Sequence, residues 1–214
     1  MLTSRGDSSL VVDWLGDQTG GRNTAVTCFY FDFAARKEQT ATSMLGSILK
    51  QALSGMEKVP EEISQFLEEQ KMAVSGRKPQ LGDIVKMLQP ITSSQRTFMV
   101  IDALDECTSV QRFRLFDSLK EILEKSPGTR ILVTGRPHIC AEIEKCLAGW
   151  VTSVSVGPVK DDIIRFLRAK LSEDETPDAM DSSLEREILE KISGSVSEMC
   201  VAAMMLRAPS HIIS

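Results

Sequence analysis

The chain has 214 residues, 42% of them hydrophobic and 26% charged, and this length suffices for one α/β domain with a small helical addition. A formal net charge of -5 without a clustered Lys/Arg stretch argues against a nucleic-acid partner. No apolar run approaches the roughly 20 residues that span a bilayer, and the first residues lack the apolar core of a signal peptide, so no membrane partner is expected.

The hydrophobic pattern alternates between strands and helices over most of the chain. Continuously apolar runs such as AVTCFYFDF (25–33) and TFMVID (97–102) are typical of strands buried on both faces of a parallel sheet. Helical spacing marks the segments between such runs, and Pro90 is expected to stop one helix. In chain order we predict a helix at 8–15 with Leu10, Val11, Trp14 and Leu15 on one face, a strand at 25–33, helices at 44–53, 60–67 and 81–88, a strand at 97–102, a helix at 109–125 with Phe113 and Phe116 inward, a strand at 129–135, a helix at 139–147 and an edge-like strand at 151–156.

After Pro158 the pattern becomes helical. Residues 160–171 and 182–203 predict two helices, joined by the polar stretch SEDETPDAMD, and the last residues lack periodicity. The predicted organisation is therefore a core at 1–158, a helical lid-like unit at 159–206 and an unstructured tail at 207–214. The predicted fold class is α/β, with a parallel sheet of about four strands flanked by helices and a small C-terminal helical unit.

Five cysteines are scattered along the chain, and none forms a CxxC pair. Their odd number and wide spacing predict reduced thiols rather than a disulfide framework. Because thiols stay reduced in the cytosol, a cytoplasmic location is expected.

The strongest candidate site is FMVIDALDEC (98–107), where a buried strand ends in Asp102 and Asp105 and Glu106 follow within one turn. Ligands of open parallel sheets lie beyond the carboxyl ends of the strands, so three carboxylates stand where a ligand binds. Mg²⁺ prefers such oxygen ligands together with phosphates. The alternative is a strand that simply leaves the core and enters a polar loop.

A second candidate is ILVTGRP (131–137), where Arg136 leaves another buried strand at the same sheet edge. A guanidinium there could reach a γ-phosphate and stabilise its charge. The alternative is an exposed arginine paired with a nearby carboxylate, such as Asp102 or Glu106. The single helix between the two strands favours the phosphate interpretation.

With these segments the chain resembles the NACHT branch of the STAND nucleotide switches, and most closely fungal proteins whose domain is similar to the nephrocystin-3 N-terminal region. The resemblance covers roughly residues 8–203. It rests on four segments in the family's order and spacing: CFYFDF, FMVIDALDEC, ILVTGRP and SVGPVKDDIIRFLRAKL.

The resemblance implies a P-loop-NTPase-like signalling domain that binds Mg²⁺ with ATP or GTP and forms homo- or hetero-oligomers with NACHT-type relatives. Asp102 resembles the Walker B magnesium ligand, and Asp105 and Glu106 resemble the acidic pair that supports hydrolysis. Arg136 resembles the sensor of the terminal phosphate. Pro158 is similar to the proline near the adenine, although a Gly-Pro pair also commonly marks a domain joint.

The phosphate-loop pattern G-x-x-x-x-G-K-[ST] does not occur in the sequence, and the glycines of GDQTGG (16–21) lack a following Lys-Ser/Thr. That loop provides most of the phosphate cradle, so we expect an N-terminally truncated domain with weak or absent nucleotide binding. In the resembled family the strand before the loop lies between the strands at 97–102 and 130–135. Its absence predicts a gap or a direct pairing there, and marginal stability unless another segment or chain fills the slot.

Three functions follow from these observations. The leading one is a fragment of a nucleotide-dependent switch with impaired nucleotide binding. The second is a non-catalytic interaction module that docks on full-length relatives. The third is a metal-dependent phosphoester hydrolase using the three carboxylates; it is the weakest, because neither His138 nor His211 stands at a ligand-like spacing from them.

Overall fold

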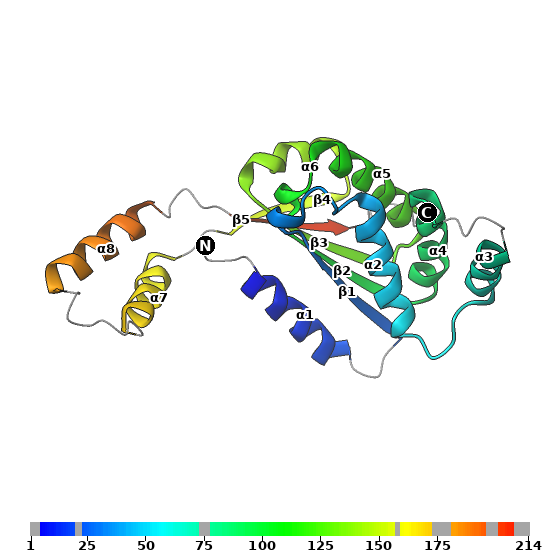
Figure 1. Ribbon diagram of the computed structural model, residues 1–214, viewed down its shortest axis with the longest axis horizontal. Helices are drawn as coiled ribbons and strands as arrows, with labels where there is room; N and C mark the ends of the chain where they lie inside the picture. Colours follow the sequence, from blue (N-terminus) through cyan, green and yellow to red (C-terminus); the bar gives the residue numbers. More distant parts are fainter. Residues whose placement is uncertain are drawn as a thin grey trace.

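One five-stranded sheet organises the molecule (Figure 1). The computed structural model describes residues 5–19, 23–72, 78–156, 159–172, 181–195 and 201–207. The strands are β1 (Thr24–Tyr30), β2 (Arg96–Asp102), β3 (Thr129–Gly135), β4 (Val151–Val156) and β5 (Val201–Arg207). Their order in the sheet is β1-β2-β3-β5-β4, with β1, β2 and β3 parallel and β5 antiparallel to both of its neighbours.

Helices flank this sheet, which confirms the α/β class with a parallel sheet predicted from the sequence. Figure 1 shows α1 on one side of the strands and α4, α5 and α6 on the other. No helix in the described ranges is long and apolar enough to cross a membrane. The helices are α1 (Arg5–Thr19), α2 (Ala41–Ser54), α3 (Glu61–Met72), α4 (Leu81–Ser94), α5 (Ser109–Lys125), α6 (Cys140–Cys146), α7 (Lys160–Ser172) and α8 (Ser182–Ser195), with single 3-10 turns η1 (Phe33–Ala35), η2 (Leu104–Glu106) and η3 (Pro137–Ile139).

The hydrophobic core lies between the sheet and the helices α2, α4 and α5. Met99 and Ile101 of β2 are two residues apart, so both point to this face, and both are fully buried. Leu45 of α2, Leu88 of α4 and Leu119 of α5 are equally buried. Each such side chain contributes about 1.5–3 kcal/mol on burial, so this face stabilises the strands that carry the candidate site.

The helix α4 continues through Pro90 to Ser94, so the predicted stop at Pro90 is wrong. Proline removes one backbone hydrogen bond, a loss that tertiary packing can offset. Leu88 and Ile91, on either side of Pro90, are both fully buried. Their burial holds the helix together across the proline.

Three apolar side chains are exposed: two from the apolar face predicted for α1, and Phe113, which was predicted to face inward. Leu10 and Trp14 of α1 are 68% and 61% exposed, whereas Val11 and Leu15 are half-buried, and α1 packs on β1 and β2. Phe113 of α5 is 50% exposed, while Phe116 is buried as predicted. Each of these helices buries only part of its apolar face, so the buried face is narrower than the apolar pattern suggested.

The two edges of the sheet differ. At β1, the side-chain amide of Gln51 accepts a hydrogen bond from the Cys28 N–H (2.9 Å) and donates one to the Cys28 carbonyl (2.8 Å). Gln51 thus imitates the backbone of a neighbouring strand. At the other edge, β4 is exposed at 152–154 and, within the described ranges, pairs only with β5, which confirms the predicted edge strand.

Of the gap or direct pairing predicted for the middle of the sheet, the structure shows direct pairing, whereas the prediction for the C-terminal segment needs correction. The strands β2 and β3 pair directly, with Met99 opposite Ile131, so there is no gap between them. The predicted helix at 182–203 ends at Ser195, and Val201–Arg207 form β5 between β3 and β4. An apolar run such as VAAMMLR fits a helix or a strand, and unpaired β3 backbone groups favour the strand. Residues 208–214 of the predicted tail lie outside the described residues.

Candidate functional site at the ends of strands β2 and β3

The site begins at Asp102, the last residue of β2, whose side chain is almost fully buried. The hydroxyl of Thr134 on the neighbouring strand β3 donates a hydrogen bond to the Asp102 carboxylate. The same hydroxyl accepts a hydrogen bond from the Ala103 N–H at 3.1 Å. Both capacities of one hydroxyl are therefore used to fix the chain where it leaves the sheet.

The chain turns sharply after Asp102. Ala103 adopts a left-handed conformation, with φ of 54° and ψ of 44°, which an L-residue other than glycine rarely adopts. The turn leads into η2, where Leu104 is fully buried. Anchored by Leu104, η2 presents Asp105 and Glu106 at the carboxyl ends of β2 and β3.

Arg136 meets both carboxylates of η2. Its backbone N–H donates to Asp105 Oδ1 at 3.1 Å, and its Nε lies 3.3 Å from Asp105 Oδ2. Its Nη2 lies 3.2 Å from Glu106 Oε1. The Arg136 side chain is 63% exposed, whereas that of Asp105 is 6% exposed. Arg136 thus neutralises part of the acidic cluster from the solvent side. Its ion pair with Glu106 is one that the alternative interpretation of Arg136 predicted.

Gly135, just before Arg136, lets these groups come together. A Cβ at this position would lie 2.6 Å from Ile139 Cδ1 and 3.4 Å from Asp105 Oδ1. The first distance is shorter than side-chain atoms tolerate, so a larger residue would force Ile139 to move. Glycine therefore allows η2 and η3 to pack against the end of β3.

Arg112 of α5 fixes the other end of the acidic turn. Its guanidinium donates to both Glu142 oxygens, at 2.9 and 2.8 Å, and to the Cys107 carbonyl. The hydrogen bonds from Arg112 hold the pKa of Glu142 below its ordinary value. Burial raises the pKa of the Cys107 thiol to about 11, so this thiol is protonated at neutral pH. Arg112 thus ties the segment after Glu106 to α6.

Comparison with known proteins identifies the fold family. The family model described as "Nephrocystin 3, N-terminal" matches residues 8–136, more than half of the chain, and this range contains Asp102, the acidic turn and Arg136. The chain belongs to the nephrocystin 3 N-terminal family. No curated protein matches it.

One solved structure aligns with this nephrocystin 3 N-terminal domain over most of its length. It is the crystal structure of the glycopeptide N-methyltransferase MtfA, with 12% sequence identity and a TM-score of 0.24. The alignment covers 94% of this chain and 90% of that chain. A similarity this low carries no argument about function.

Four of the five predicted site residues of this nephrocystin 3 N-terminal domain lie together. Asp102, Asp105, Glu106 and Arg136 meet at the carboxyl ends of two adjacent parallel strands. Pro158 lies outside the described residues. Sequence reasoning missed Thr134 and Arg112. The only signal for Thr134 was its place as the last polar residue of an apolar strand. For Arg112 it was a cation on the largely apolar inner face of a helix.

The donors of this site fit a magnesium ion in kind, because they are carboxylate oxygens. Asp105 and Glu106 face Arg136, and within the described parts of the chain no three His, Cys, Asp or Glu side chains are grouped to hold a metal. Mg²⁺ commonly takes one or two protein carboxylates and completes its shell with water and phosphate oxygens. Asp102 is the residue placed to supply such a carboxylate.

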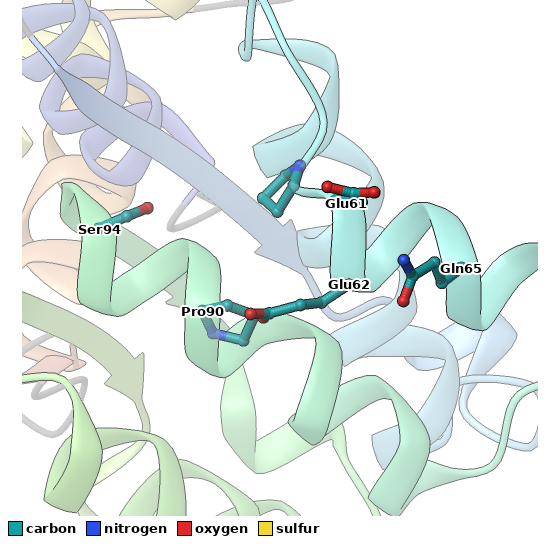
Figure 2. A pocket seen from close by; sticks show the side chains of 6 residues that line it. Glu61, Glu62, Gln65, Pro90 and Ser94 are labelled. Atoms are coloured by element: carbon teal, nitrogen blue, oxygen red, sulfur yellow. The ribbon is translucent and has the colours of Figure 1, made fainter.

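A separate surface hollow lies away from these carboxylates. It has a volume of about 370 Å³ and is lined by α4 residues, among them Pro90, and by residues at the start of α3 (Figure 2). Glu61 and Glu62 stand in the first turn of α3, where negative charge is favourable beside the helix N-terminus. The two glutamates therefore have a structural reason to be there, and the hollow shares no residue with the site at β2 and β3.

Proposed function

We propose that this chain is the core of a NACHT-type nucleotide-dependent switch, acting in the cytoplasm and binding Mg²⁺-nucleotide weakly. One observation carries the proposal: Asp102, Asp105, Glu106 and Arg136 meet beyond the carboxyl ends of adjacent parallel strands, where open α/β sheets bind their ligands. The thiols of Cys28, Cys107 and Cys146 form no disulfide, which agrees with the cytoplasmic location.

In this proposal Asp102 holds Mg²⁺, which supplies positive charge to the phosphates when it is bound. Arg136 contacts the terminal phosphate, and Asp105 and Glu106 orient a water molecule. Arg136 cannot pair fully with both carboxylates and a phosphate at once. Nucleotide binding therefore competes with the Arg136 ion pairs, and this competition is the proposed switch.

Weak binding follows from the sequence. The pattern G-x-x-x-x-G-K-[ST], whose backbone amides and lysine cradle phosphates, does not occur in the 214 residues. Contacts from Asp102 and Arg136 alone predict dissociation constants in the millimolar range.

Titration with a fluorescent ATP or GTP analogue, with and without Mg²⁺, tests the proposal. We expect weak binding that requires Mg²⁺, and loss of this Mg²⁺-dependent binding in Asp102→Asn. The matched control is Asp161→Asn in α7, which changes the charge equally at an exposed position. Tight binding without Mg²⁺, or an Asp102→Asn variant that binds like the parent, would contradict the proposal.

A second function is a non-catalytic interaction module that docks on full-length NACHT-type relatives. The observation that favours it is the pairing of Asp105 and Glu106 with Arg136, which satisfies these charges without a ligand. Co-purification with a relative in nucleotide-free buffer, unchanged by Asp102→Asn, would support this function over the first.

A further inference from the structure

The strand β5 lies between β3 and β4 and links the edge strand to the rest of the sheet. β5 pairs antiparallel with β3 from Arg130 to Gly135 and with β4 from Val151 to Val156. Within the described ranges, these are the sheet's only antiparallel pairings, and β4 has no other strand partner. Within the described ranges, β5 therefore pairs with the backbone groups on the second edge of β3 and on the only paired edge of β4.

Between β4 and β5 the chain runs out into a helical arm, α7 and α8. Figure 1 shows these two helices beside each other and away from the sheet and its covering helices. Their main contact is with each other. Phe166 of α7 and Leu184 of α8 are 39% and 41% exposed, so the arm carries apolar surface that its own core leaves uncovered.

We propose that two copies of this chain exchange their arms, so that β5 of each copy fills the slot between β3 and β4 of the other. Exchange forms the same backbone pairs between copies that β5 forms within one copy, so no ladder bond is lost. The exposed apolar residues of the two arms, including Phe166 and Leu184, then become available to cover one another, which offsets the entropy of association.

The composition of β5 suits a central position supplied by another copy. The sequence VAAMMLR has no proline and no charge before Arg207, so it can pair on both edges without a missing donor or a buried charge. A second copy is the favoured occupant because it presents this same strand in the same register. The exchange needs no nucleotide, so its test is independent of the proposed function.

Cross-linking between two marked copies tests the exchange. Leu132 of β3 and Met205 of β5 are register partners, so Leu132→Cys is placed in one tagged copy and Met205→Cys in another. After co-expression, a short thiol-to-thiol reagent should cross-link the two variants into mixed dimers. The control is either variant co-expressed with the parent chain, which measures cross-linking through the native thiols. The yield of mixed dimers should be well above this background. If cross-links form only inside the double variant, and the mixed sample stays at background, the proposal is wrong.

Light scattering after size-exclusion chromatography provides the second measurement. The parent chain and Met204→Ala should show a dimer fraction that rises with protein concentration. Met204→Pro should lose that dimer peak, because proline removes a ladder donor from β5. A dimer that persists in Met204→Pro, or a parent chain that is monomeric at all concentrations, would overturn the proposal. If Met204→Pro does not fold, the cross-linking result decides.

Discussion

The two halves of the sheet are built on different principles. In the parallel half, β1 to β3, side chains such as Ile101 and Val133 are fully buried under helices that connect the strands. In the antiparallel half, the side chains of β4 are exposed at 152–154. The described side chains of β4 are therefore less closely packed than those of the parallel half.

This difference explains where the candidate site lies. A site of several charged groups needs a backbone that does not shift, and close packing supplies it. Asp102 ends β2 and Arg136 follows β3, which are the most buried strands among those whose side chains the structure describes. Arg112 fixes the turn after Glu106 to α6. The antiparallel half contributes none of the described site residues. Stability and site geometry should therefore respond strongly to changes in the first half and weakly to changes in the second.

The largest effect should come from a cavity in the parallel half. Ile101→Ala removes most of a fully buried side chain and should lower the free energy of unfolding by about 2–5 kcal/mol. Val154→Ala in β4 truncates a side chain that is 48% exposed and should change it by less than about 0.5 kcal/mol. Urea denaturation of both variants makes the comparison. Equal losses would show that the two halves are equally packed.

Next in size is the Arg112–Glu142 pair. Glu142→Gln removes a charge-assisted hydrogen bond and should cost about 1–3 kcal/mol at neutral pH. Because the pKa of Glu142 is lowered in the folded state, its contribution is present above the ordinary value of 4.5 and is lost as the pH falls through the folded value. The difference in melting temperature between parent and variant should therefore shrink as the pH falls below 4.5.

The control for this pair is Glu187→Gln, which breaks an exposed pair with Lys191 in α8. Such surface pairs contribute under about 1 kcal/mol, so this variant should melt close to the parent at every pH. A Glu142→Gln deficit that does not change with pH would show that lost packing, and not charge, causes it.

A smaller effect is expected at the capped edge of the parallel half. Gln51→Ala removes two hydrogen bonds to the Cys28 backbone and should cost about 1–2 kcal/mol. Amide exchange of Cys28, followed by NMR, should accelerate by the same free energy. Gln89→Ala is the matched control, since the Gln89 side chain hydrogen-bonds exposed side chains of α5. Unchanged exchange at Cys28 would contradict the capping role.

The smallest effect concerns Arg136, at the boundary between the two halves. Its side chain is 63% exposed, so Arg136→Ala should change thermal stability by less than about 1 kcal/mol, and added salt should remove most of the difference. A loss above about 2 kcal/mol would show that the acidic turn depends on this arginine for its fold, and would argue against a freely moving sensor.

The parallel half was predictable because its signals are local. A run such as TFMVID gives both a buried strand and the position of Asp102 at its end, and Arg136 follows another strand in the same way. The left-handed turn at Ala103 was not predictable, since alanine gives no sign of positive φ.

The rest depends on contacts between distant segments. Thr134 binds Asp102 only because β2 and β3 are adjacent and in a particular register, and Arg112 meets Glu142 only after α5 and α6 are placed. The segment VAAMMLR becomes a strand because β3 and β4 each offer it an edge. No local pattern encodes these three outcomes.

The hydrogen bonds from the Gln51 side chain to the Cys28 backbone also affect where the sheet can add a strand. Because the Gln51 side-chain amide already bonds both backbone groups of Cys28 on the β1 edge, a further strand adds more readily at the β4 edge. The sheet therefore favours the addition of a strand at one of its two edges. Two copies that joined edge to edge would terminate each other, whereas a sheet with two open edges would propagate into a fibre.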